Sequence, residues 1–262
     1  MEWALRRHPD PALELSGARV LVTGAAGGIG QAVCTELAAL GCSIVASDLD
    51  VAGLEGRGWR SLPLDVTDDG GVRAALEEVG PLDVLVLSHG VTALGPALEK
   101  PMSAVDRVLD VNLRGAILVA RHALPGLLER RGRIAVLSSV SGFAPLVNRT
   151  AYSASKHGLH GYFESLRAEL VDAGVSVTMV APSFVATGLE ERAAFRAQGS
   201  AGSWSTTGEV GDANSVARAI VAGLAQRRDL VLPSRLAKTS YLVSRVAPPL
   251  YERIMRRRIL GP

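Results

Sequence analysis

The sequence has few cysteines, few aromatic residues and no long apolar run. Only 2 of its 262 residues are cysteine, Cys34 and Cys42, and both lie where a predicted helix passes into a strand. Two such residues do not build a disulfide framework or a four-cysteine metal site, so we interpret both as small buried apolar side chains. No apolar run approaches the roughly 20 residues that a membrane-spanning helix needs.

The N-terminal segment and the charge distribution exclude further classes. MEWALRRHPDPALEL, residues 1–15, has no uninterrupted apolar core, so it is not a secretory signal and a cytoplasmic protein is expected. The net charge of the chain is +2, but from Arg235 to the C-terminus seven basic residues face one acidic residue, so that segment alone carries +6. A nucleic-acid-binding domain would spread its basic residues over the folded surface, so no nucleic-acid partner is expected.

The rest of the sequence is typical of a globular α/β enzyme. Apolar residues make up 48% of the chain and charged residues 21%, which are ordinary values for that class. Short runs rich in Val, Ile and Leu alternate with helical patterns, and the absence of polar/apolar alternation favours parallel strands covered on both faces. The predicted strands are 18–24, 42–48, 59–66, 82–90, 132–139, 175–182 and 229–233, and the predicted helices are 28–40, 68–79, 103–130, 151–173 and 212–225. This alternation predicts one doubly wound parallel sheet in a single domain.

We place that domain at residues 16–233, after an N-terminal extension of residues 1–15. Residues 187–211 are rich in small residues without a core period, and we expect them to form a substrate loop. Residues 234–262 form a basic amphipathic segment, which Pro248 and Pro249 are expected to interrupt. We interpret it first as helices that pack on the domain or on a neighbouring subunit; a lid over the substrate and attachment to an anionic membrane surface are the alternatives.

A glycine-rich turn, TGAAGGIG, lies between the first predicted strand and the first helix. Its Gly24, Gly28 and Gly30 allow a tight turn and a close approach of the backbone to a pyrophosphate, and the N–H groups of the helix then point at the phosphates. Asp48 ends the second predicted strand, where a carboxylate accepts hydrogen bonds from ribose hydroxyls and repels a 2′-phosphate. The pattern therefore predicts a dinucleotide site that favours NAD.

YSASK, residues 152–156, supplies candidate catalytic groups. Positions i and i+4 share a helix face, so we expect the ammonium of Lys156 beside the phenol of Tyr152, where it lowers the tyrosine pKa from its usual value of about 10. Such a tyrosine takes a proton from an alcohol or donates one to a carbonyl oxygen. Ser139 ends a predicted strand thirteen residues upstream, within reach of the same substrate oxygen, and Asn112 lies in a helical stretch where an amide side chain needs a local role.

Taken in order, several motifs resemble the compact, single-domain branch of the short-chain dehydrogenase/reductase family over residues 16–233. They are TGAAGGIG, Asp48, the Asp65-Val66 pair, DVN, the serine, YSASK and PSFVAT. The resemblance implies a Rossmann-like fold, a nicotinamide cofactor and a homodimer or homotetramer. It also implies that Ser139 orients the substrate oxygen, that Tyr152 transfers the proton, and that Lys156 lowers the tyrosine pKa and holds the nicotinamide ribose. Asn112 would anchor a water that relays protons.

The resemblance also implies which residues hold the cofactor. Asp65 and Val66 would flank the adenine, and Val185 and Thr187 would hold the carboxamide. The predicted cofactor residues are Gly24, Gly28, Ile29, Gly30, Asp48, Asp65, Val66, Gly90, Tyr152, Lys156, Pro182, Val185 and Thr187, and no metal ligand is predicted. Ser138 is the rival of Ser139 for the serine role; Ser139 is preferred because its spacing from the tyrosine matches that of the family.

Two positions depart from the family pattern. Its Asn-Asn-Ala-Gly stretch is LSHG here, so Ser88 and His89 replace residues that steady the sheet and line the cofactor ribose, while Gly90 is retained. We expect His89 to be structural, with a cofactor contact as the alternative. Ser183 replaces the glycine after Pro182, a change that bears on the backbone near the nicotinamide. Neither change removes a catalytic group.

These observations predict an NAD-dependent oxidoreductase that interconverts a hydrophobic secondary alcohol and its ketone. The expected substrate pocket is apolar except for one serine, and its residues are Ser141, Phe143, Leu146, Val147, Phe184, Leu189 and Trp204. One alternative is an NADPH-dependent biosynthetic ketoreductase, which Asp48 disfavours. Another is a dinucleotide-binding sensor without turnover, which the serine, tyrosine and lysine disfavour.

Overall fold

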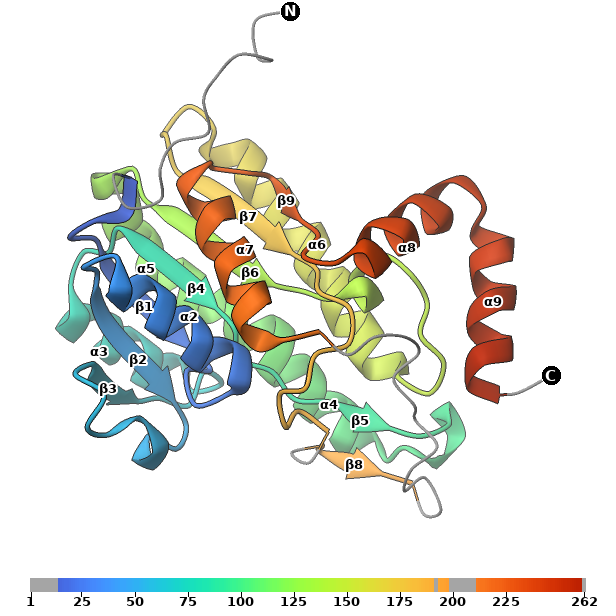
Figure 1. The fold of residues 1–262 in the computed structure, drawn as a ribbon. Coiled ribbons are helices and arrows are strands. Elements are labelled where there is room, and N and C mark those ends of the chain that lie inside the picture. Colours follow the sequence, from blue (N-terminus) through green and yellow to red (C-terminus); the bar gives the residue numbers. More distant parts are fainter. Residues whose placement is uncertain (1–13, 191–192, 198–210, 261–262) are drawn as a thin grey trace, which may run out of the picture.

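A parallel sheet of seven strands, in the order β3-β2-β1-β4-β6-β7-β9, forms the centre of the molecule (Figure 1). The computed structural model describes residues 14–190, 193–197 and 211–260, without the side chains of residues 258–260. The strands of this sheet are β1 (Arg19–Thr23), β2 (Ser43–Asp48), β3 (Arg60–Pro63), β4 (Val84–Leu87), β6 (Arg133–Leu137), β7 (Ser176–Val180) and β9 (Leu230–Val231). The helices are α2 (Gly28–Ala39), α3 (Asp69–Val79), α4 (Met102–Leu109), α5 (Gly115–Arg130), α6 (Thr150–Leu170), α7 (Ala213–Ala225), α8 (Arg235–Val246) and α9 (Pro248–Leu260).

Helices cover both faces of the sheet, as the unbroken apolar strands predict. On one face α2 and α7 pack through side chains such as Val33 and Ile220, and Figure 1 shows these two helices crossing the strands. On the other face α3, α5 and α6 pack through Val72, Leu127 and Phe163. All four residues of β4 are buried, because this central strand lies between the two layers. The doubly wound α/β prediction is confirmed.

Helix α6 changes character along its length. Its buried residues in the first two turns include Tyr152, Ser155 and Lys156, which carry polar groups. The buried residues farther along are all apolar: Leu159, Phe163, Leu166 and Leu170. The apolar part packs into the core behind the sheet and so fixes the position of the polar part.

The predicted helix 103–130 is divided in the structure. Between α4 and α5 lies η4 (Asp110–Arg114), a π-helical turn that contains Asn112. Such turns are rare and are frequent at functional sites. The sequence analysis also did not predict a small parallel pair, β5 (Ala93–Leu94) with β8 (Phe195–Arg196), because two-residue strands are too short to show a period.

The cysteines and the C-terminal segment complete the chain. Cys34 is fully buried and Cys42 half-buried, and both are free thiols. The C-terminal segment forms α8 and α9, which meet at Ala247 before Pro248, and it packs on the domain because Tyr251 and Met255 are buried against Ala144. Among the described residues, no helix is long and apolar enough to cross a membrane.

Candidate active site

The carboxyl ends of the sheet strands open into one cavity of about 840 Å³. The strand order reverses between β1 and β4, and successive loops diverge there to leave a crevice. Every predicted cofactor residue lines this cavity: Gly24, Gly28, Ile29, Gly30, Asp48, Asp65, Val66, Gly90, Tyr152, Lys156, Pro182, Val185 and Thr187. Ser139 lines it as well, so the loops after six different strands contribute to a single site.

At one end of the cavity, the glycine-rich turn leaves no room for side chains. Gly24 has a φ of +69°, and a Cβ atom added there would lie 2.5 Å from the backbone of His89. A Cβ added to Gly30 would lie 2.1 Å from the carbonyl oxygen of Gly24. No side chain caps the N-terminus of α2, and its first residues line the cavity. A bare turn that leads into an uncapped helix N-terminus fits the pyrophosphate of a dinucleotide.

Two acidic side chains, Asp48 and Asp65, line the same end of the cavity. Asp48 Oδ2 accepts a hydrogen bond from the Ala26 N–H (2.9 Å) and Oδ1 accepts one from the Leu49 N–H (2.8 Å), so the carboxylate is fixed beside the glycine turn. Asp65 accepts from the hydroxyl and the backbone N–H of Thr67, and these bonds lower the pKa of Asp65. Both acids therefore offer carboxyl oxygens to hydroxyl or amino donors of a bound nucleotide.

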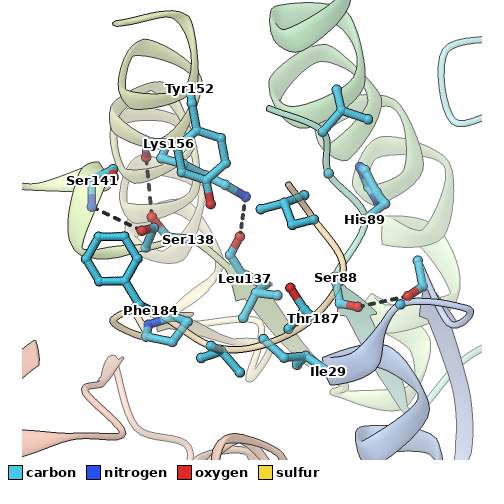
Figure 2. Close-up of a pocket in the computed structure, with 18 of the residues that line it drawn as sticks. Ile29, Ser88, His89, Leu137, Ser138, Ser141, Tyr152, Lys156, Phe184 and Thr187 are labelled. Carbon is cyan, nitrogen blue, oxygen red and sulfur yellow. Dashed lines mark hydrogen bonds between the residues drawn. The ribbon is translucent and has the colours of Figure 1, made fainter. Parts of the chain in front are cut away.

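Tyr152 and Lys156 lie side by side on α6, as the i,i+4 spacing predicts (Figure 2). The Lys156 Nζ lies 5.5 Å from the centre of the Tyr152 ring and donates a hydrogen bond to the Leu137 carbonyl oxygen at 2.7 Å. Burial lowers the pKa of Lys156 to about 8. Burial raises the pKa of Tyr152, while the charge of Arg149 and a hydrogen bond from Ser139 lower it. The guanidinium of Arg149 therefore contributes to lowering the pKa of the tyrosine, and the same effect of Lys156 stays a prediction.

The two serines after β6 differ in their partners. Ser139 precedes the short helix η5 (Val140–Gly142), and its hydroxyl oxygen accepts a hydrogen bond from the Ser141 N–H at 3.1 Å. Ser138 is 2% exposed and points its hydroxyl at the Lys156 carbonyl oxygen, 3.5 Å away. Since only Ser139 acts on the phenol of Tyr152, the geometry favours it for the serine role.

Asn112 lies behind the cavity wall and does not line it. Its Oδ1 accepts from the Val91 N–H (2.8 Å), and its Nδ2 donates to the Val91 carbonyl oxygen (2.9 Å) and to the Ser155 hydroxyl (3.0 Å). The amide thus ties the loop after β4 to the π-helical turn and to α6. A Cβ added to Gly90 would lie 3.3 Å from Asn112 Oδ1 and 3.8 Å from Lys156 Nζ, so the glycine lets these groups approach. The water relay through Asn112 stays a prediction.

His89, which departs from the family pattern, is held by the sheet and faces the cavity. Its Nδ1 lies 2.6 Å from the hydroxyl of Thr23 at the end of β1. Burial and the nearby charge of Lys156 lower the pKa of His89 to about 3, so the imidazole is neutral at physiological pH. The hydrogen bond gives His89 a structural role, and its place on the cavity wall leaves it next to the cofactor residues as well.

The sequence analysis missed Arg149, which lies three positions before Tyr152. Arg149 is only 7% exposed, pairs with Glu190 from the loop after β7, and lies 6.0 Å from the ring centre of Phe184. A charged residue at the start of a helix carries no local signal of burial. Only the contact with a residue 41 positions later reveals it.

The C-terminal helices, for which a lid over the substrate was one alternative, close the apolar end of the cavity. The cavity residues from α8 and α9 are Leu236, Thr239, Ser240, Val243, Tyr251, Ile254 and Met255. Of the predicted substrate residues, Ser141, Leu146, Phe184 and Leu189 line the same space. Phe143 instead packs edge-on against Tyr241, Val147 is half-buried outside the lining, and Trp204 lies outside the described residues. The C-terminal helices α8 and α9 therefore pack on the domain and cover the pocket at the same time.

Lys156 makes the stability of the fold depend on pH. Its folded pKa of about 8 lies below the ordinary value of 10.5, so the unfolded chain binds more protons between these two values. The contribution of Lys156 to the free energy of unfolding is therefore expected to rise with pH across that window, by up to about 3 kcal/mol. Burial raises the pKa values of Cys34 and Tyr152, so these two groups contribute in the opposite direction at alkaline pH. Urea unfolding of the wild type and of Lys156→Met from neutral to alkaline pH therefore measures the contribution of Lys156 as a growing difference between the two curves. Lys238→Met, at an exposed lysine, is the control and should follow the wild-type curve; parallel curves for wild type and Lys156→Met would contradict the expectation.

Comparison with known proteins agrees with this geometry. The family model described as short chain dehydrogenase matches residues 18–196. The chain is 30% identical to the dehydrogenase/reductase SDR family protein 7-like of Anopheles gambiae, over 94% of this chain and 84% of the relative. It is 35% identical to the acetoacetyl-CoA reductase of Allochromatium vinosum, over 64% of this chain and 75% of the relative.

Solved structures show the same fold. A short chain dehydrogenase from Burkholderia cenocepacia, crystallised in complex with NADP, superposes with a TM-score of 0.80 at 22% identity, covering 95% of this chain and all of the other. A short-chain dehydrogenase from Streptomyces avermitilis gives a TM-score of 0.79 at 24% identity, over 92% and 98% of the two chains. The chain belongs to the short-chain dehydrogenase/reductase family, and it is an oxidoreductase with a dinucleotide cofactor of the NAD(P) type.

Proposed function

We propose that this oxidoreductase uses NAD to interconvert a hydrophobic secondary alcohol and its ketone, with Tyr152 as acid and base. One observation carries the proposal: the buried phenol lies in the same cavity as the glycine turn and the apolar wall. In the oxidative direction, a bound nicotinamide would supply the acceptor for the hydride of the carbinol carbon. Tyr152 takes the hydroxyl proton from the same alcohol, and Ser139 holds the oxygen by a hydrogen bond. In the reductive direction, the neutral phenol donates its proton to the carbonyl oxygen.

Asp48 supports the choice of NAD. A carboxylate fixed by two backbone N–H groups, with Gly27 and Leu49 beside it on the cavity wall, suits two ribose hydroxyls as donors. A 2′-phosphate at that place would meet a like charge. The alternative, an NADPH-dependent ketoreductase, would require Asp48 to move or to be neutralised.

The wall around Tyr152 supports an apolar substrate. Leu146, Phe184, Leu189, Val243 and Met255 line the cavity, and the polar side chains in this part of the lining include Ser139, Ser141, Arg149, Glu190, Thr239 and Ser240. An apolar wall with a few converging polar groups excludes water and orients one polar atom of a ligand. A secondary alcohol or ketone on a ring system or an acyl chain has this chemistry. The homodimer or homotetramer expected from the family stays a prediction.

Cofactor preference is the first quantity to measure. The melting temperature is expected to rise more with NAD or NADH than with NADP or NADPH at equal concentrations, because ligands that bind the folded state stabilise it in proportion to ln(1 + [L]/Kd). A screen of apolar secondary alcohols for NAD reduction then identifies the substrate class. Equal or larger stabilisation by NADP(H) would refute the choice of cofactor, and reduction of NAD by short polar alcohols alone would refute the apolar substrate.

A further inference from the structure

The outer surface of the C-terminal helices exposes large apolar side chains. On α8 and α9, Leu242 is 63% exposed, Val246 75%, Leu250 49% and Ile254 39%. These are four of the nine large apolar side chains that the described part of the chain exposes, and they lie within 13 consecutive positions. Of the other five, Leu98 and Met102 lie four positions apart, and Leu49, Leu128 and Val171 are single. Single exposed apolar residues need no explanation, whereas a cluster marks an interaction surface.

Basic side chains surround this cluster. The exposed basic residues of α8 and α9 with described side chains are Arg235, Lys238, Arg245, Arg253, Arg256 and Arg257. Glu252 is the one acidic residue between Arg235 and the C-terminus. Over residues 14–190, 193–197 and 211–257, the ion pairs of the protein all lie elsewhere, so none of these cations forms an ion pair with another residue of these ranges.

The inner and outer faces of α8 and α9 are distinct. On α8, Ala237 and Ser240 are buried, while Lys238, Leu242 and Arg245 follow each other at helical spacing on the opposite side. On α9, Tyr251 and Met255 face inward against Ala144, and positions 250, 253, 254 and 257 form the outer stripe. Figure 1 shows both helices standing out from the body at the end of the molecule where α6 begins. The outer surface is therefore available to a large flat partner.

We infer that this surface docks on an anionic lipid bilayer. The apolar side chains would enter the boundary between headgroups and acyl chains, and the arginines would contact lipid phosphates, which is the usual arrangement of interfacial amphipathic helices. Charge favours a bilayer over a second copy of the chain, because two such surfaces would bring six uncompensated cations against six others. An anionic membrane supplies the opposite charge over an area of any size.

The docked surface adjoins the substrate end of the cavity. Ile254 is both exposed and part of the cavity lining, and Met255 in the same turn of α9 lines the cavity from inside. An apolar alcohol or ketone dissolved in the bilayer would then meet α9 before it meets water. This last step rests on the proposed function, whereas the docking itself does not.

Vesicle co-sedimentation of the full chain tests the docking. The chain is expected to bind phosphatidylcholine vesicles that contain phosphatidylglycerol at least tenfold more tightly than vesicles of phosphatidylcholine alone, and high salt should weaken the binding. The double variant Leu242→Ser with Val246→Ser changes exposed side chains outside the cavity lining. It should reduce binding at least tenfold and leave stabilisation by NAD unchanged. The matched control, Leu128→Ser with Val171→Ser, changes exposed apolar side chains elsewhere and should bind as the wild type does.

Three results would overturn the inference. The first is a wild type that binds anionic vesicles no more tightly than vesicles of phosphatidylcholine alone. The second is equal binding of the wild type and the Leu242→Ser, Val246→Ser variant to anionic vesicles. The third is a wild-type dimer in analytical ultracentrifugation that this variant loses, because a second copy would then cover the surface. Vesicle binding requires neither cofactor nor substrate, so loss of the proposed activity would not affect this test, and failure to bind vesicles would not affect the proposed activity.

Discussion

Replacing Tyr152 with phenylalanine should lower kcat by about 10²- to 10⁴-fold, the usual contribution of a positioned acid or base. Phenylalanine keeps the ring that packs with Ala104, Val108 and Ala151, but it has no proton to exchange. Steady-state kinetics with an alcohol found in the screen measures the loss. The melting temperature with and without NAD should stay close to that of the wild type, because the hydroxyl alone is removed.

Tyr162→Phe provides the matched control. This tyrosine lies on the same helix, contacts Phe163 edge-on at 5.1 Å and does not line the cavity. Its loss of a hydroxyl should leave kcat unchanged. Full activity in Tyr152→Phe would exclude this residue as acid and base and with it the proposed mechanism.

The double variant Asp48→Asn with Leu49→Arg should shift cofactor preference from NAD toward NADP by about 10²-fold or more. Asparagine removes the charge that repels a 2′-phosphate and keeps an oxygen for the Ala26 N–H, so the glycine turn is retained. Arginine at position 49, where the side chain is 62% exposed, adds a cation for the phosphate. Each charged hydrogen bond contributes about 1.5–3 kcal/mol, which corresponds to the expected factor.

The ratio of Kd values for NADP and NAD, measured by titration, gives this shift. Asp50→Asn is the control. The Asp50 carboxylate accepts a hydrogen bond from the Ala52 N–H (3.0 Å) and does not line the cavity, so this substitution should not affect the ratio. An unchanged ratio in the double variant would mean that Asp48 does not contact the adenosine ribose.

The sequence predicted most of the fold and the cofactor end of the site, because both depend on local patterns. Unbroken apolar runs identify parallel strands. The glycine turn follows β1 and Asp48 ends β2, so the turn and the carboxyl group meet at the same edge of the sheet. Most strand and helix ends lie within two residues of the predicted ones, but β3, β4 and α6 each end three residues early, at Pro63, Leu87 and Leu170.

The rest of the site could not be predicted, because it depends on contacts between distant segments. Arg149 looks like a solvated helix start, and its burial follows from Glu190 and Phe184 on another loop. Tyr251 and Met255 reach a cavity whose opposite wall lies more than 100 residues earlier in the chain. The π-helical turn at Asn112 also has no helical period that distinguishes it from an ordinary turn.

The buried residues of α6 are polar in its first two turns and apolar farther along, so substitutions in the two parts affect different properties of the protein. The first two turns hold a buried cation and a buried phenol, arrangements that lower stability and that catalysis requires. The apolar residues from Leu159 onward offset that cost without touching the reacting atoms. Thermostability can therefore be improved in the second half of the helix while specificity is selected in the loops around the first, so the two properties can be optimised independently on one continuous element.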